Sequence, residues 1–225
     1  MSKTILGKNV LTTLEEWVLP QHTALVVVDL QNDFCSQGGR IEQLGCNIDS
    51  LQACVAPTMR LVEEARRASV LVIYTKGKAY PNGLCTAPPD LARKSVMFGD
   101  KEPLLVVEGT WGYELVDMLK PLPNEVIIEK FRHNAFRGTN LDNLLRSNDI
   151  KTVIVSGVLT QQCVAATIRG AIEYDYYVVV PRDCVEASNA DLQNAALLVI
   201  SYILPKGGLT ESKHIIDVWK LPAQQ

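Results

Sequence analysis

The sequence predicts an α/β protein with a three-layer α/β/α, Rossmann-like fold, in which helices cover both faces of a mainly parallel sheet of roughly six strands. Short runs of β-branched and apolar residues alternate with segments of helical periodicity. These runs are continuous rather than alternating, which is typical of strands covered on both faces. The order strand, helix, strand, helix favours right-handed βαβ units and hence a parallel sheet.

The predicted strands are short segments rich in valine and isoleucine. They are "ALVVVDL" (24–30), "VLVIYT" (70–75), "EVIIEK" (125–130), "TVIVSG" (152–157) and "YYVVVP" (176–181). Such segments pack well as buried strands because a β-branched side chain suits the pleated surface. In sheets of this kind, ligands bind beyond the carboxyl ends of the strands. The residues that end each run are therefore the ones to inspect for function.

The predicted helices lie between these strands. Residues 48–68 carry apolar side chains at helical spacing, and Thr139 is a plausible N-cap for a helix over 139–146. Residues 161–174 place Val164 and Ile168 on one face, as expected of a helix packed on a sheet.

The remaining segments show no such periodicity. Residues 76–105 are rich in proline, glycine and lysine, which predicts a long surface excursion that acts as a lid or a subunit contact. No linker divides the chain, so residues 1–225 are expected to form a single domain with an N-terminal arm at 1–22. The last segment, 205–225, carries no sign of chemistry.

Composition excludes several classes of function. The 225 residues have a net charge of −3 with no basic run, so we expect no nucleic-acid partner and no membrane surface. The N-terminus lacks the apolar core of a signal peptide, which predicts a cytoplasmic protein. The six cysteines form no CxxC pair and are expected to be free thiols.

Three chemically different side chains stand at the ends of predicted strands. Asp29 ends the first run, Lys130 ends the third, and Cys163 follows the fourth. Taken singly, each is more often a turn residue, a solvated charge or a packing residue. Together they supply the base, the cation and the nucleophile of acyl transfer, so we expect them to form one catalytic site.

These motifs carry a family resemblance. The stretches "ALVVVDLQNDF", "EKFRHNAFRGTNLDNLL" through "VSGVLTQQCVAATIRGA", and "YYVVVPRDCVEA" resemble the isochorismatase-like cysteine hydrolases, a superfamily that includes N-carbamoylsarcosine amidases, ureidoacrylate amidohydrolases and biuret or triuret hydrolases. The resemblance covers residues 24–187. It implies an Asp–Lys–Cys triad at Asp29, Lys130 and Cys163.

The resemblance also implies a cis peptide bond between Val158 and Leu159, and an oxyanion hole formed by the backbone N–H groups of Leu159 and Cys163. If a helix begins near residue 160, Cys163 lies in its first turn. The positive end of the helix dipole and Lys130 are then expected to lower the pKa of the thiol. Asp29 would accept the thiol proton, and a thioester would form and be hydrolysed.

The chain departs from the nicotinamidases of the superfamily, which bind a divalent metal through an Asp-x-His motif after the second strand. The matching stretch, "YTKGKAYPNG", contains no histidine. His22, His133 and His214 are the three histidines of the chain, and a lone histidine is more often structural or exposed than a ligand. We therefore expect no metal, no other cofactor and no nicotinamidase activity.

Several residues are candidates for binding the substrate. The aromatic side chains of Phe34 and Phe136 are candidate pocket walls, with ordinary core packing an equal alternative. Trp111 either covers the cleft or anchors the excursion. The polar candidates for hydrogen bonds to a substrate are Asn32, Arg137, Gln161 and Gln162. Arg137 is either a group that binds a substrate carboxylate or a surface charge.

The leading hypothesis is a metal-independent cysteine amidohydrolase that acts on a small linear amide, N-carbamoyl or ureido compound. One alternative is an isochorismatase-type hydrolase that cleaves a vinyl ether. A second is a catalytically silent scaffold in which Cys163 is redox-active. A dinucleotide-binding oxidoreductase is disfavoured because "DLQNDF", and no GxGxxG, follows the first strand. Members of the superfamily are commonly dimers or tetramers, so a homo-oligomer is expected.

Overall fold

The computed structural model describes residues 3–221. Its central sheet has seven strands in the described chain, with the order β5-β4-β3-β6-β7-β9 and the short strand β8 paired to β6. All pairings within this sheet are parallel. The strands are β3 (Thr23–Val28), β4 (Leu71–Gly77), β5 (Val126–Lys130), β6 (Thr152–Val158), β7 (Tyr177–Pro181), β8 (Val185–Glu186) and β9 (Leu209–Thr210).

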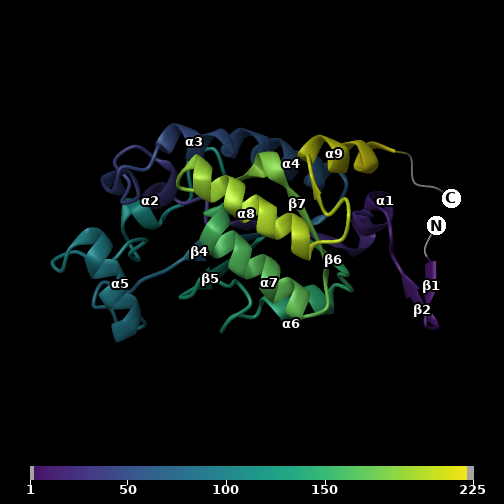
Figure 1. Ribbon diagram of the computed structural model, residues 1–225. Helices are drawn as coiled ribbons and strands as arrows, with labels where there is room; N and C mark the ends of the chain where they lie inside the picture. Colours follow the sequence, from purple (N-terminus) through teal and green to yellow (C-terminus); the bar gives the residue numbers. More distant parts are fainter. Residues whose placement is uncertain (1–2, 222–225) are drawn as a thin grey trace.

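Helices cover both faces of this sheet, as the sequence predicts (Figure 1). One face carries α3 (Ile48–Ala53), α4 (Val55–Arg67) and α9 (Ser212–Lys220). The other carries α6 (Leu141–Ser147), α7 (Ala165–Glu173) and α8 (Ala190–Ile203). The side chains of the central strand β3 alternate between two cores: Leu25 and Val27 face the first layer, whereas Val26 faces the second.

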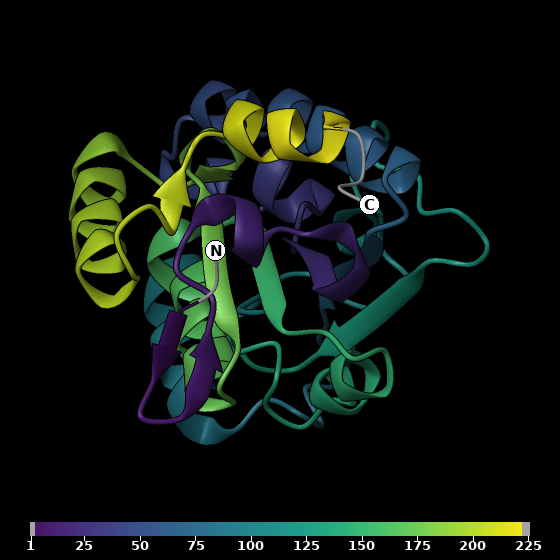
Figure 2. The ribbon, with the colours of Figure 1, turned by 90° about the vertical axis from the view of Figure 1, so that its right-hand side faces the viewer.

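Smaller elements lie outside these layers. The hairpin β1 (Lys3–Ile5) and β2 (Lys8–Val10) extends along the periphery of the molecule, as Figure 2 shows, and leads into α1 (Leu14–Trp17). Short 3₁₀ turns occur at 20–22, 42–44, 111–113 and 182–184, and α2 spans Asn32–Cys35. Among residues 3–221, no helix has both the length and the apolar character needed to cross a bilayer.

The helix predicted over 48–68 is two helices. Asn47 caps α3 by accepting hydrogen bonds from the backbone N–H groups of Asp49 and Ser50, and α4 starts afresh at Val55. Pro57 explains the break, because proline lacks the N–H that a continuous helix would require and is tolerated in a first turn. Similarly, the helix expected at 139 begins at Leu141, whose N–H donates to the Thr139 hydroxyl.

The excursion at 76–105, expected to lack regular structure, contains the 11-residue helix α5 (Pro88–Phe98). Its end signals are local: prolines occupy its first positions, and Gly99 follows it with φ of +83°. None of its residues is fully buried, so it shows little apolar periodicity. In Figure 1, α5 projects at one end of the molecule, beyond α2.

Candidate active site

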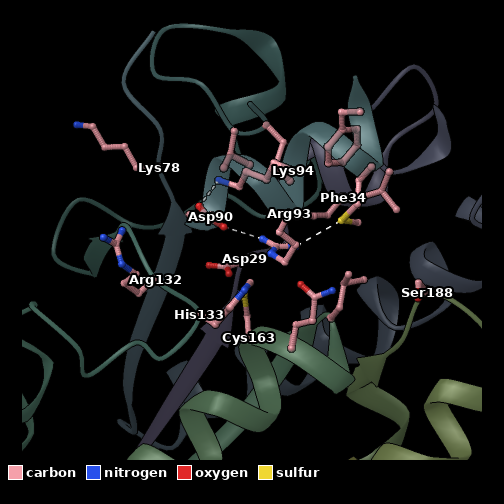
Figure 3. Close-up of a pocket in the computed structure, with 18 of the residues that line it drawn as sticks. Asp29, Phe34, Lys78, Asp90, Arg93, Lys94, Arg132, His133, Cys163 and Ser188 are labelled. Atoms are coloured by element: carbon pink, nitrogen blue, oxygen red, sulfur yellow. Dashed lines mark hydrogen bonds and ion pairs between the residues drawn. The ribbon is translucent and has the colours of Figure 1, made fainter. Parts of the chain in front are cut away.

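The carboxyl ends of β3, β5 and β6 bring Asp29, Lys130 and Cys163 together. Asp29 and Cys163 are labelled in Figure 3. The Nζ of Lys130 lies 2.6 Å from Oδ2 of Asp29 and 3.4 Å from Sγ of Cys163. All three side chains are buried, and the exposed fraction of Asp29 is 0%. A carboxylate, an ammonium and a thiol that are distant in sequence therefore share one small site.

Asp29 is held by the strand beside it. Its backbone has φ of +52°, in the left-handed region that aspartate tolerates better than most residues. The hydroxyl of Thr75, at the matching level of β4, donates to Oδ1 at 2.6 Å, while Lys130 contacts Oδ2. Each carboxylate oxygen thus has a partner, and the carboxylate plane is fixed relative to the sulfur.

Cys163 lies in a π-helical turn over Thr160–Val164 that precedes α7. The peptide bond between Val158 and Leu159, just before this turn, is cis. The N–H of Gln162 and that of Val164 both donate to the carbonyl of Leu159. This wide turn places Leu159, Gln162 and Cys163 together on the wall of one cavity.

The charges around the sulfur correct one expectation. Burial raises the pKa of the Cys163 thiol to about 12, and the effect of the Lys130 cation, which lowers it, is opposed by the Asp29 carboxylate. Burial also lowers the pKa of Lys130, but Asp29 and Cys163 more than offset this, so that the pKa is raised. The resting site is therefore a neutral thiol beside an ion pair, not a thiolate at a helix terminus.

His133 is a further group beside the Cys163 sulfur. Its Nδ1 lies 3.3 Å from Sγ of Cys163, although the residue as a whole is exposed. Partial burial, followed by the nearby cations Lys130 and Arg93, lowers the pKa of His133. The imidazole is consequently neutral near pH 7 and able to donate or accept one hydrogen bond at Nδ1, according to its tautomer.

The triad lines a cavity of about 230 Å³. Helix α5 forms one wall with Asp90, Arg93, Lys94, Met97 and Phe98. The segment expected to be a lid or a subunit contact therefore contributes a wall of the cavity that Asp29, Lys130 and Cys163 also line.

Of the residues suggested for substrate binding, two line this cavity: Phe34 and Gln162. Asn32 instead holds the backbone, because its amide donates to the carbonyl of Trp111 and accepts from Ser36. Gln161 donates to the hydroxyl of Ser188, which itself lines the cavity.

Two other suggestions do not fit the structure. Phe136 is buried against Tyr174 and Tyr176 in the hydrophobic core that also contains Cys163, but it does not line the cavity. Arg137 is exposed and is not among the cavity residues. Both follow "KFRHNA" closely in sequence, but the chain turns away from the site after His133. Trp111 is half exposed and lines a separate depression on the surface.

Sequence reasoning missed Thr75, His133 and Arg93. Thr75 ends the run 70–75 beside Asp29, so the strand-end rule would have found it. His133 lies three residues after Lys130 in the same motif. Arg93 carried no sequence signal, because only the packing of α5 places it at the cavity.

Within the described chain, no three His, Cys, Asp or Glu side chains are grouped as metal ligands. The absence of a metal from the functional site stays a prediction.

The fold and this site define a class: a hydrolase with an α/β fold in which a buried cysteine, lysine and aspartate meet beyond the carboxyl edge of a parallel sheet. The model of the isochorismatase domain matches residues 23–208. The chain belongs to the isochorismatase family.

Three similar proteins illustrate the relationship. The ureidoacrylate amidohydrolase RutB of Enterobacter sp. (strain 638) is 33% identical over 80% of this chain and 83% of its own length. A cysteine hydrolase from Pseudomonas syringae pv. phaseolicola 1448A has a TM-score of 0.76 at 28% identity, over 89% of this chain and 93% of that one. The N-carbamoylsarcosine amidase of Thermoplasma acidophilum has a TM-score of 0.66 at 25% identity, over 85% and 96% of the two chains.

Proposed function

We propose that this protein is a cysteine amidohydrolase that cleaves the C–N bond of a small linear amide, N-carbamoyl or ureido compound through a thioester. The observation that carries the proposal is the position of the Lys130 ammonium, 2.6 Å from the Asp29 carboxylate and 3.4 Å from the Cys163 sulfur. Nucleophilic acyl transfer requires this combination of base, cation and thiol. The names of the relatives, a ureidoacrylate amidohydrolase and an N-carbamoylsarcosine amidase, support the same class of bond.

The reaction begins with a neutral thiol, because the pKa of Cys163 is raised to about 12. Asp29 accepts the thiol proton as the sulfur attacks the carbonyl carbon of the substrate. Lys130 stays between them and stabilises the charge that develops on the sulfur. Proton transfer during attack suits a buried site, because a free thiolate does not have to form before the sulfur bonds to the substrate carbon.

Attack forms a tetrahedral intermediate whose oxygen carries negative charge. The backbone N–H groups of Leu159 and Cys163 are the proposed donors to this oxygen, and both residues line the cavity. Loss of one such donor typically costs about 10²–10³ in rate. The C–N bond then breaks, and the nitrogen leaves as ammonia or an amine with the proton from Asp29.

A water molecule completes the cycle. Asp29 takes a proton from this water as its oxygen attacks the thioester carbon. The C–S bond breaks, the acid product forms, and the sulfur regains its proton. The same carboxylate thus acts twice, first as base toward sulfur and then as base toward water.

The test uses a panel of simple ureas, N-carbamoyl amino acids and aliphatic amides with the purified protein. Ammonia release is expected from at least one class, together with a mass increase on Cys163 when turnover is stopped rapidly with acid. Cys163→Ala should fold normally and release no ammonia, and Asp29→Asn should do the same. Normal turnover by the folded Cys163→Ala variant would reject the mechanism, and release of pyruvate from isochorismate instead of ammonia would favour the vinyl-ether alternative.

A further inference from the structure

The wall that α5 contributes to the cavity is cationic. Figure 3 shows Asp90, Arg93 and Lys94 on this helix, with the Arg93 side chain directed toward Asp29, Cys163 and His133. Arg93 is close enough to His133 for an electrostatic effect, because it is one of the cations that lower the pKa of His133. Arg93 therefore faces the reacting groups from the opposite side of the cavity.

The charges that line the cavity do not balance. Its cations are Lys78, Arg93, Lys94, Lys130 and Arg132, whereas its carboxylates are Asp29 and Asp90. The charge of Lys130 is balanced by Asp29. The Nζ of Lys78 forms ion pairs with Glu108 Oε1 at 2.6 Å and with Glu129 Oε2 at 2.9 Å.

Part of the excess positive charge of the cavity lies on α5. Asp90 is shared by two cations, because Arg93 and Lys94 each lie 2.9 Å from one of its oxygens. One positive charge of this trio is left without a counter-charge. Arg132, on the opposite rim, donates to the backbone carbonyls of Phe131 and Cys85 and has no carboxylate partner in the described chain. A cavity with excess positive charge in a protein of net charge −3 favours an anion.

The guanidinium of Arg93 also has spare hydrogen-bonding capacity. Its Nη2 donates to Asp90, but its Nη1 donates to the thioether sulfur of Met97 at 3.4 Å. A thioether is a weak acceptor. A substrate carboxylate would be a far better partner, since guanidinium and carboxylate form charge-assisted and often bidentate hydrogen bonds.

We infer that Arg93 binds a carboxylate on the substrate, so that the protein prefers ureido and N-carbamoyl acids to neutral ureas of the same size. This inference rests on the proposed amidohydrolase function and assigns its substrate class. The carbamoyl group lies against Cys163, and the acid end lies under α5. Arg93 is a specificity-determining residue in this arrangement, and the excursion at 76–105 is the element that carries specificity.

The experiment compares two substrates that differ at one end only: 3-ureidopropionate, which ends in a carboxylate, and butylurea, which ends in a methyl group. We expect kcat/KM of the native protein to favour the acid by about 10- to 100-fold, the range of a hydrogen bond to a charged group. Arg93→Met should remove most of this preference, and Arg93→Lys should keep part of it, because lysine retains the charge but not the fork.

Lys101→Met is the matched control. Lys101 follows α5 in the same segment and lines the separate depression beside Trp111. The variant removes an equal charge and should leave the ratio of the two kcat/KM values within about threefold of native. Calorimetric binding of 3-ureidopropionate to Cys163→Ser, with and without Arg93→Met, gives a readout that needs no turnover.

The outcomes separate the two proposals. Equal kcat/KM for acid and urea in the native protein, or equal losses for both substrates in Arg93→Met, would overturn the assignment of Arg93 and leave the amidohydrolase intact. If neither substrate nor any amide of the panel releases ammonia, the amidohydrolase proposal fails. Calorimetry then decides on Arg93 separately: acid binding that is unaffected by Arg93→Met would reject its role.

Discussion

The Cys163 thiol is close to two opposite charges, and its reactivity depends on which of them dominates. Burial raises its pKa, Lys130 lowers it, and Asp29 raises it. Removal of the Asp29 charge should therefore lower the pKa of the thiol, even though it removes the proposed catalytic base. Reactivity toward an alkylating reagent and catalytic activity should respond to this substitution in opposite directions.

We expect iodoacetamide to label Cys163 slowly in the native protein. With a pKa of about 12, the thiolate fraction near pH 8 is on the order of 10⁻⁴. The labelling rate should rise about tenfold for each pH unit from 8 to 10. Asp29→Asn should label faster than the native protein at each pH. Mass spectrometry of the Cys163 peptide measures both rates, with Cys46 as a reference within the same chain.

A labelling rate for Cys163 that does not change above pH 7.5 would contradict this expectation, because it would show a thiol that is already ionised. Such a result would indicate that the pKa of the Cys163 thiol is low, as its position near the start of a helix suggests.

His133 offers a second residue-scale prediction. The Cys163 thiol proton is directed to Asp29, so we expect Nδ1 of His133, 3.3 Å from Sγ, to donate a hydrogen bond to the sulfur as charge develops there. The side-chain amide of asparagine places a donor near the same point, whereas leucine of similar size does not. His133→Leu should lower kcat by about 10- to 100-fold, and His133→Asn by less than about fivefold. Steady-state kinetics measures kcat of both variants, after their melting temperatures have been shown to be equal. Equal losses of kcat in the two variants would contradict a hydrogen bond from His133 to the sulfur.

At the scale of elements, the strand ends determine the site. β3 and β6 pair in parallel register with Val28 opposite Gly157, directly before Asp29 and two residues before Leu159. Gly157 has φ of +108°, and a Cβ there would lie 2.0 Å from the carbonyl oxygen of Val28. No side chain fits at this position without displacement of the strand that carries Asp29.

Gly157→Ala should therefore destabilise the protein by at least about 3 kcal/mol, the combined cost of overpacking and a disfavoured φ. Gly138→Ala is the control, because Gly138 has φ of +71° but nothing within 4 Å of an added Cβ. This change should cost only about 1–2 kcal/mol. Urea unfolding at equilibrium measures both. Equal stability losses would show that contact with Val28 is not what requires glycine at 157.

The elements also show where sequence patterns suffice and where they fail. The five longer strands were predictable because each is a short run rich in β-branched residues, and their carboxyl ends located Asp29 and Lys130. The expected burial on both faces is wrong for the edge strand β5, where Ile127 is exposed. The two-residue strands β8 and β9 are too short to show a pattern. Helix α5 was missed because an exposed helix needs no apolar stripe. The sequence marks this helix only by the prolines at its first positions and by Gly99 after its last residue.

At the scale of the whole molecule, the expected homo-oligomer stays a prediction. Helix α8 carries large apolar side chains on its outer face, and the exposed fractions of Leu198 and Tyr202 are 71% and 89%. Asp191 is the single charged residue of this helix. A second copy of the chain is the partner we expect for this surface, because closed symmetric assemblies use one surface patch twice.

Light scattering at micromolar concentration should give the mass of a dimer or a tetramer. A variant with both Leu198→Glu and Tyr202→Glu should have a smaller mass, since it places four charges where two copies of α8 would meet. Leu84→Glu, at another exposed leucine on the excursion, should leave the mass unchanged. A monomeric native protein would contradict the expectation.

Local pattern alone determined the α/β class, the positions of the five longer strands along the chain, and the candidate triad of Asp29, Lys130 and Cys163. These features are readable because burial and backbone conformation act on neighbouring residues and leave a period in the sequence. Tertiary packing alone decided that α5 closes the cavity with Arg93, that His133 reaches the sulfur, and that Phe136 and Arg137 turn away. It also decided the ionisation of the thiol, because the pKa of a buried group depends on charges and desolvation that several distant segments create together.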